Sequence, residues 1–232
     1  YRFDNYLNRC CDNYPTHELG PIAKLLDINR GNRIMTVSSF ASKSAGLSEY
    51  IKTRVDATDE MKAANFAQGD IITTVLTCAR GETILLRLDT TLPRSYSRDF
   101  TVRGTKGLYM QDTNSVFLDG DEEAFEPVKY YAKALNNAVK FEDEYLPDIW
   151  KSVTEEMLKA GHGGMDWFAY MGFTNALING EEMPIDVYDA ATWQAVAVLS
   201  EMSIKQGGAP QIMPDFTNGK WFKRPRKDVC EF

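Results

Sequence analysis

Two β-rich runs separated by a short turn constrain the fold of this chain most strongly. The runs are IITTVLTCA, residues 71–79, and TILLRLDTT, residues 83–91, and they flank Arg80-Gly81-Glu82. Runs rich in isoleucine, threonine, valine and leucine on both sides of a glycine-containing turn are typical of a β-hairpin. The middle of the chain is therefore predicted to contain antiparallel strands.

Further elements are expected on both sides of this hairpin. The last third changes from the period of strands to that of helices, and its helices are expected to end at glycines. The helix over 165–180 is apolar nearly all round, so we expect it to be buried. Strands are expected at residues 33–40, 100–111 and 115–120, and helices at residues 146–161, 165–180 and 186–205, the last with Asp186 as its N-cap.

This order of elements predicts the α+β class. We expect a two-layer domain in which a large, mostly antiparallel sheet is covered by helices on one face. The length of 232 residues is sufficient for one large core. We therefore expect a single domain over residues 1–232, with the open sheet face as a candidate interface.

Charge and composition exclude several classes of function. The chain has 26 basic and 33 acidic residues, a net charge of −7 that repels phosphate backbones, so nucleic acid is not an expected partner. No apolar run is long enough for a membrane span. No cysteine or histidine spacing matches a metal site, so none is predicted. The basic tail KWFKRPRKD, residues 220–228, is interpreted as a solvated extension.

The stretch YPTH, residues 14–17, is the strongest candidate for chemistry. Pro15 favours an extended conformation for Tyr14, and Thr16 is expected to cap a helix that begins at His17. Both rings would then project from a loop-to-helix junction. A histidine that merely packs at a helix start remains an equal alternative on the local pattern. The other histidine, His162, lies among glycines and is interpreted as part of a turn between helices.

Four longer blocks resemble a known family. They are YPTHELGPIAKLLDINRGNR, GHGGMDWF, VYDAATWQAVAVLSE and GGAPQIMPDFTNGKW, and together they extend the resemblance over nearly the whole chain. They resemble the C-terminal domain of the NAD-dependent glycosidases of glycoside hydrolase family 109, within the Gfo/Idh/MocA oxidoreductase superfamily. Asn13 stands where the sugar dehydrogenases of that superfamily carry an aspartate four residues before their histidine, which favours the glycosidase branch.

The resemblance implies a redox-assisted cleavage of N-acetylgalactosaminides or related sugars. NAD⁺ would oxidise the sugar at C3, the aglycone would leave by elimination, water would add, and NADH would restore the C3 hydroxyl. By similarity Arg2, Tyr14, His17 and Tyr96 would contact the substrate, and His17 and Tyr14 would be catalytic. NAD would be bound mainly by an N-terminal Rossmann domain, which this sequence lacks, so we expect the isolated chain to be inactive.

Two other functions remain open on the sequence. One is a domain of a plain NAD(P)-dependent sugar or inositol dehydrogenase, and the other is a non-catalytic module for sugar binding or assembly. The resemblance also suggests a homo-oligomer formed through the open sheet face, and a periplasmic or exported protein.

Overall fold

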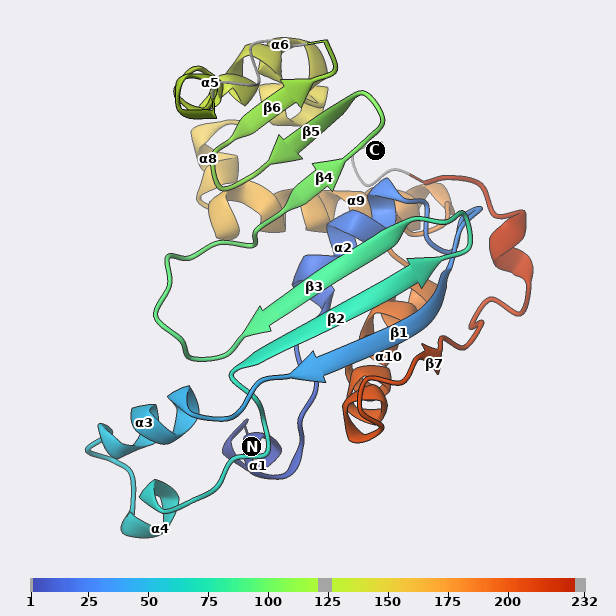
Figure 1. Ribbon diagram of the computed structural model, residues 1–232. Coiled ribbons are helices and arrows are strands. Elements are labelled where there is room, and N and C mark those ends of the chain that lie inside the picture. The colour runs from blue at the N-terminus through green and yellow to red at the C-terminus, as the bar shows by residue number, and fades with distance from the viewer. Residues whose placement is uncertain (1, 121–126, 228–232) are drawn as a thin grey trace. The chain divides into compact units, whose positions relative to one another are not determined.

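The computed structural model describes residues 2–120 and 127–227 (Figure 1). The described residues divide into two compact units, the first formed by residues 2–93 with 176–227 and the second by residues 94–120 with 127–175. A single substrate-binding domain over residues 1–232 stays a prediction. The structure adds that this span consists of two units, each with its own sheet.

The first unit is built on a four-stranded antiparallel sheet of order β3-β2-β1-β7. The predicted hairpin is confirmed, because β2 and β3 pair from Thr77 opposite Thr83 to Ile71 opposite Asp89. Gly81 in its turn has a φ of 99°, which glycine adopts without strain. The strands are β1 (Ile34–Ala41), β2 (Ile71–Cys78), β3 (Thr83–Asp89) and β7 (Gln211–Ile212).

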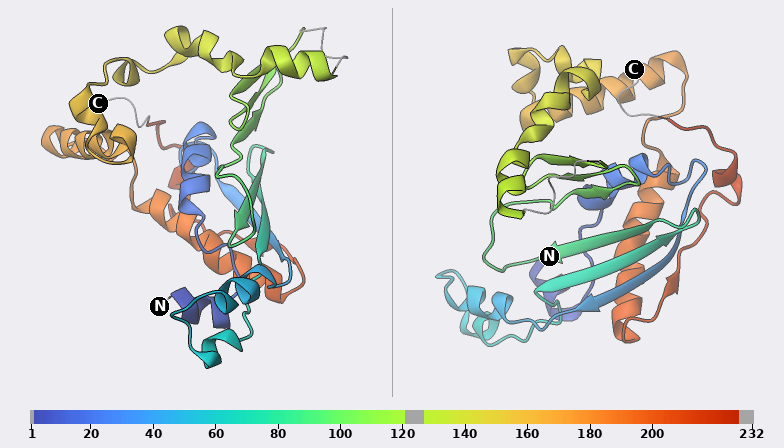
Figure 2. Two further views of the ribbon diagram at one scale, coloured as in Figure 1. Left: turned by 90° about the vertical axis from the view of Figure 1, so that its left-hand side faces the viewer. Right: turned by 45° about the horizontal axis from the view of Figure 1, so that its top comes forward.

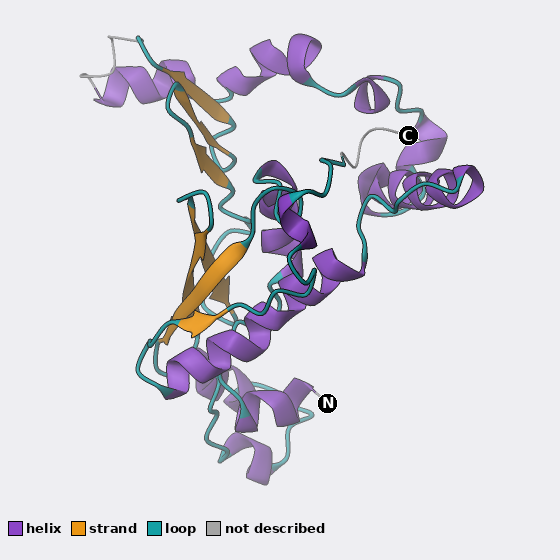
Figure 3. Cartoon of the chain, turned by 90° about the vertical axis from the view of Figure 1, so that its right-hand side faces the viewer, coloured by secondary structure: helices purple, strands orange, loops and turns teal. Residues whose placement is uncertain are grey.

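Two helices, α2 (Thr16–Leu25) and α10 (Val187–Lys205), cover one face of this sheet (Figures 2 and 3). The core lies between these layers and includes Leu19, Val37 and Val196, whose side chains are fully buried. Alternation along the strands leaves the opposite face open, as with Leu85 and Ile212. The predicted α+β class with helices on one sheet face is confirmed. The unit also contains α1 (Arg2–Asn8), α3 (Gly46–Lys52), α4 (Asp59–Lys62) and a 3₁₀ turn, Lys220–Phe222.

The start of α10 is the most strongly fixed helix end. Asp186 accepts hydrogen bonds from the amides of Tyr188 and Asp189, and the Asp189 carboxylate accepts one from the Asp186 amide, as predicted for a capping residue. Buried Arg30 donates to both carboxylate oxygens of Asp189 at 2.9 and 3.0 Å. Arg224 in the C-terminal tail pairs with Asp186 and is 9% exposed. The interpretation of the tail as a solvated extension is therefore wrong at this residue.

The second unit contains a separate three-stranded sheet, β4-β5-β6, with antiparallel neighbours. The strands predicted over 100–111 and 115–120 are confirmed, but they do not join those of the first unit into one large sheet. Its elements are β4 (Thr101–Arg103), β5 (Gly107–Met110), β6 (Ser115–Leu118), α5 (Pro127–Ala134), α6 (Glu142–Tyr145), α7 (Asp148–Lys151), α8 (Glu155–Leu158), most of α9 (Met165–Asn179), and the 3₁₀ turns Asn137–Phe141 and His162–Gly164.

Two helix predictions fail in this part of the chain. The helix expected over 146–161 is two short helices, α7 and α8, because Thr154 begins a new helix by accepting a hydrogen bond from the Met157 amide. Helix α9 ends at Asn179, directly before Gly180 as expected, but it is not buried: Tyr170 and Ile178 are 74% and 75% exposed. Apolar composition all round a helix does not identify which face packs.

No helix in the part of the chain that the structure describes combines the length and the apolar character needed to cross a membrane.

Candidate functional site

Tyr14 and His17 form a pair at the surface of the first unit. Their ring centroids are 4.7 Å apart with planes inclined by 24°, and the Tyr14 Oη and His17 Nε2 atoms are 3.5 Å apart. Tyr14 is 54% exposed and His17 is also exposed. Both polar atoms are therefore open to a small molecule, and they lie too far apart for a strong hydrogen bond between them.

Packing of α2 against α10 presents this pair to solvent. Leu19 is fully buried, and Gly20 lies so near the Trp193 indole that a Cβ there would come within 3.4 Å of the ring. The prediction that Thr16 caps this helix is wrong. Thr16 is instead the first helical residue, and Pro15 occupies the N-cap position without a side-chain cap.

Gln68 holds the segment before Tyr14 in place, and sequence analysis missed it. Its side chain is 1% exposed, accepts from the Cys11 amide at 3.2 Å and donates to the Cys11 carbonyl at 3.0 Å. Its own amide donates to the Tyr6 carbonyl on α1 at 3.0 Å. One buried residue thus anchors both α1 and the Tyr14 segment. A single glutamine between a helix and a strand carries no sequence pattern that would have revealed this role.

Arg2 is the first residue of α1 and is exposed. The next residue, Phe3, packs edge-on against Phe66, with ring centroids 5.7 Å apart. The helix that carries Arg2 and the loop that carries Tyr14 therefore share the anchor at Gln68. Contact of Arg2 with a substrate stays a prediction.

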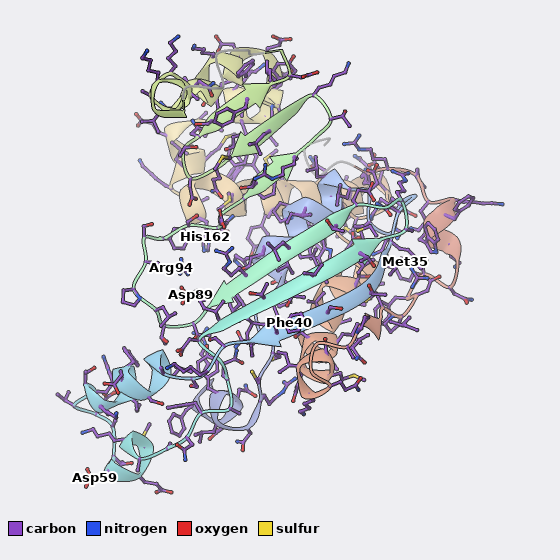
Figure 4. The ribbon with its side chains drawn as sticks, in the orientation of Figure 1. Met35, Phe40, Asp59, Asp89, Arg94 and His162 are labelled. Carbon is purple, nitrogen blue, oxygen red and sulfur yellow. The ribbon has the colours of Figure 1, made fainter. Side chains whose placement is uncertain are left out.

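Tyr96 lies in the loop that follows β3 and is 84% exposed. Arg94, labelled in Figure 4, is the first residue of the second unit in this loop. Tyr96 therefore belongs to the second unit, whereas Arg2, Tyr14 and His17 belong to the first. Its approach to the other three residues stays a prediction.

Asp12 is a second residue that sequence analysis missed. It is fully buried two positions before Tyr14, and its amide donates to the Ser200 hydroxyl at 2.9 Å. Burial raises the pKa of Asp12 to about 6, while interactions with the Thr74 hydroxyl and the Tyr14 amide lower that pKa. Neither interaction reaches normal hydrogen-bond geometry at the carboxylate oxygens. A carboxyl group is thus held beside the candidate site at an electrostatic cost.

His162 lies in the turn between α8 and α9, as the sequence indicated. Its φ is 45°, and its Nδ1 is 2.9 and 3.0 Å from the two carboxylate oxygens of Asp166. This local contact accounts for the position of the imidazole, and no catalytic role is assigned to it.

No three histidine, cysteine, aspartate or glutamate side chains within residues 2–120 and 127–227 are grouped as a metal site. The sequence contains no glycine-rich dinucleotide fingerprint. The residues of this chain therefore do not form a standard dinucleotide-binding turn.

Comparison with known proteins places this chain in a family. The sequence matches the family described as "Glycosyl hydrolase 109, C-terminal domain" over residues 1–223. A glycosyl hydrolase family 109 protein of Stenotrophomonas maltophilia is 41% identical over all of this chain and 49% of its own length. An alpha-N-acetylgalactosaminidase of Tannerella forsythia is 39% identical over 97% of this chain and 46% of its own length.

A more divergent relative, an alpha-N-acetylgalactosaminidase of Shewanella oneidensis, is 34% identical over 90% of this chain and 45% of its own length. The chain spans about half the length of the curated relatives it matches. The family match over residues 1–223 includes all four of the sequence blocks that indicated the resemblance. The chain therefore belongs to glycosyl hydrolase family 109 and corresponds to the C-terminal domain of that family.

Proposed function

We propose that this chain is the substrate-binding and catalytic domain of an NAD-dependent glycosidase that cleaves N-acetylgalactosaminides or related sugars. The observation that carries the proposal is the stacked and exposed Tyr14–His17 pair, in a chain of a glycosidase family. Two relatives bear the name alpha-N-acetylgalactosaminidase, which supports the substrate class. Periplasmic location or export is proposed on the family resemblance.

The geometry of the pair suits the handling of a sugar hydroxyl. A ring nitrogen of an imidazole can accept a proton from a hydroxyl group. The 3.5 Å between Tyr14 Oη and His17 Nε2 leaves both atoms available to one hydroxyl group, which can donate to the imidazole and accept from the phenol. We assign His17 the role of accepting the proton of the C3 hydroxyl. We assign Tyr14 the role of orienting that hydroxyl by a hydrogen bond.

Arg2 and Tyr96 would complete the substrate contacts. The Arg2 guanidinium offers several donors in one plane to sugar hydroxyls or to an amide carbonyl. Tyr96 offers a phenol from a loop, where binding residues are common. NAD, bound by a part of the protein outside this chain, would supply the acceptor for the C3 hydride and return it. The isolated chain is therefore expected to be inactive.

The decisive experiment uses the full-length protein with an aryl α-N-acetylgalactosaminide. Release of the aryl group with no net formation of NADH is expected for the proposed glycosidase. NADH formed in proportion to sugar consumed would instead identify a sugar dehydrogenase. If neither the aryl group nor NADH is formed in the presence of NAD, the proposal is overturned. The chain would then be a non-catalytic module for sugar binding or assembly.

We also propose that the open face of the first sheet forms a homo-oligomer. Met35 and Phe40, labelled near opposite ends of β1 in Figure 4, are 41% and 54% exposed. Leu85 on β3 and Ile212 on β7 add 59% and 79% exposed side chains. Sedimentation of the full-length protein tests this proposal. Leu85→Arg is expected to lower the oligomeric mass, and an unchanged mass would remove this face from the interface.

A further inference from the structure

A cluster of buried polar side chains includes Asp12, two residues before Tyr14, and ties this part of the chain to the core. Its members are fully buried and come from the loop before α2, from β1, from β2 and from α10: Asp12, Ser39, Thr74, Ser200 and Ser203. Ser39 donates to Ser203 through its amide at 2.8 Å and to Thr74 through its hydroxyl at 2.9 Å. The cluster therefore connects sheet, helix and site loop.

The hydroxyl groups of this cluster have normal hydrogen bonds, but the oxygens of the Asp12 carboxylate do not. Ser200 accepts from the Asp12 amide and donates to the Ala197 carbonyl, both at 2.9 Å. Thr74 accepts from Ser39, so its own hydrogen remains for Asp12. The Tyr14 amide is the other group that interacts with the carboxylate. Both carboxylate oxygens are buried without a hydrogen bond of normal geometry.

An unsatisfied buried carboxylate is costly and needs a reason beyond packing. An asparagine would fill the same volume without a charge. Residues that reduce stability in this way are often retained at functional sites. Asp12 is two residues before Tyr14, one of the two residues of the exposed pair, and the Asp12 amide ties this segment to Ser200 on α10.

We propose that Asp12 is a positioning residue for Tyr14 and His17. Its carboxylate attracts the Tyr14 backbone N–H and fixes the direction in which the segment from Tyr14 to His17 leaves the core. Asp12 does not touch the substrate and acts through the ring pair. This inference rests on the proposed function of that pair. Small displacements of a catalytic group are costly, and a shift of about 1 Å can lower the rate a hundredfold.

The test compares Asp12→Asn with Ser203→Ala in the full-length protein. Ser203→Ala removes an equally buried member of the cluster, whose hydroxyl accepts from the Ser39 amide, so it controls for damage to the core. For each variant we would measure kcat and KM for an aryl α-N-acetylgalactosaminide and the melting temperature. The imidazole NMR signal of His17, identified by its absence in His17→Gln, would also be recorded.

Asp12→Asn is expected to lower kcat about ten- to hundredfold with a smaller change in KM, and to shift the His17 signal away from its position in the ring stack. Its melting temperature should not fall. Ser203→Ala should lower the melting temperature but leave the His17 signal unchanged. A wild-type kcat and His17 signal in Asp12→Asn would overturn the proposal.

The NMR readout separates this inference from the proposed function. If the wild-type protein does not cleave the sugar, a shifted His17 signal in Asp12→Asn still supports positioning, and an unshifted one still contradicts it. Should Asp12→Asn not fold, Asp12→Ser, which is smaller and keeps a hydroxyl, is carried through the same measurements with the same expected and contrary results.

Discussion

Two buried aspartates of the first unit differ in the hydrogen bonding of their carboxylates. Asp70, 3% exposed, accepts hydrogen bonds from the amides of Ala45, Gly46 and Leu47 at the start of α3. Asp12, 0% exposed, has no hydrogen bond of normal geometry to either carboxylate oxygen. The first carboxylate stabilises a helix start, whereas the second costs stability beside the candidate site. Burial alone therefore does not reveal what a charged residue does.

The largest expected effect is the loss of the satisfied carboxylate. Asp70→Asn places an NH₂ group against buried backbone donors, so it should lower the free energy of unfolding by about 3 kcal/mol. Urea unfolding of the full-length protein measures this change. Asp56→Asn, at an exposed ion pair with Arg54, is the matched control and should be nearly neutral. Equal effects of the two substitutions would contradict the role given to Asp70.

Substitution of Asp12, the other buried aspartate, is expected to raise the free energy of unfolding instead of lowering it. The folded pKa of Asp12 is about 6, above the ordinary 3.8. Between these pH values the unfolded chain releases the proton that the folded chain keeps, so stability falls as the pH rises towards 6. Asp12→Asn should therefore match wild type below about pH 4 and exceed it by about 2 to 3 kcal/mol above about pH 6.

Urea unfolding across pH 3.5 to 8 measures this difference between the variant and wild type, the range being set around the two pKa values. The titratable groups Cys11 and Glu201 do not obscure this difference in stability. Burial raises the pKa of the Cys11 thiol to about 11, outside the range. Burial tends to raise the pKa of Glu201, but Lys205 and Arg9 lower it overall. A lower stability of Asp12→Asn at pH 7 would show that the carboxylate is satisfied after all.

A smaller effect is expected at the anchor of the site. Gln68→Met removes the side-chain hydrogen bonds to the Cys11 backbone, so it should cost about 1 to 2 kcal/mol and raise KM by loosening the Tyr14 segment. Unfolding and steady-state kinetics of the full-length protein measure both. Gln194→Met, at an exposed position of α10, is the control. An unchanged KM would show that Gln68 does not affect substrate binding at the Tyr14–His17 pair.

The smallest effect is expected from a hydroxyl beside Asp12. Thr74→Val keeps the shape of the side chain but removes the acceptor of the buried Ser39 hydroxyl, so it should cost about 1 kcal/mol. Because the Thr74 hydroxyl lowers the pKa of Asp12, its loss should also move the pH transition of stability upwards. Thr73→Val on the other face of β2 should leave that transition in place. If the pH transition moves equally in both variants, the Thr74 hydroxyl does not lower the pKa of Asp12.

The sequence predicted those parts of the molecule that local patterns determine. The hairpin around Gly81 and the capped start of α10 at Asp186 follow from residues adjacent in sequence, and both are confirmed. Tyr14 and His17 are three residues apart, so their pairing was also accessible. Asp12 and Gln68 were missed because their roles depend on partners distant in sequence, Thr74 and Cys11. The exposed apolar face of α9 was missed for the same reason, since packing is not a local property.

The central claim is that His17 takes a proton from the substrate, and substitution of each histidine of this chain in the full-length protein tests it most directly. His17→Ala should reduce kcat for an aryl α-N-acetylgalactosaminide at least a hundredfold with the fold intact, the scale of general-base catalysis. His162→Ala, at an exposed turn in the other unit, should retain nearly full activity. Comparable activity of His17→Ala and wild type would contradict the account.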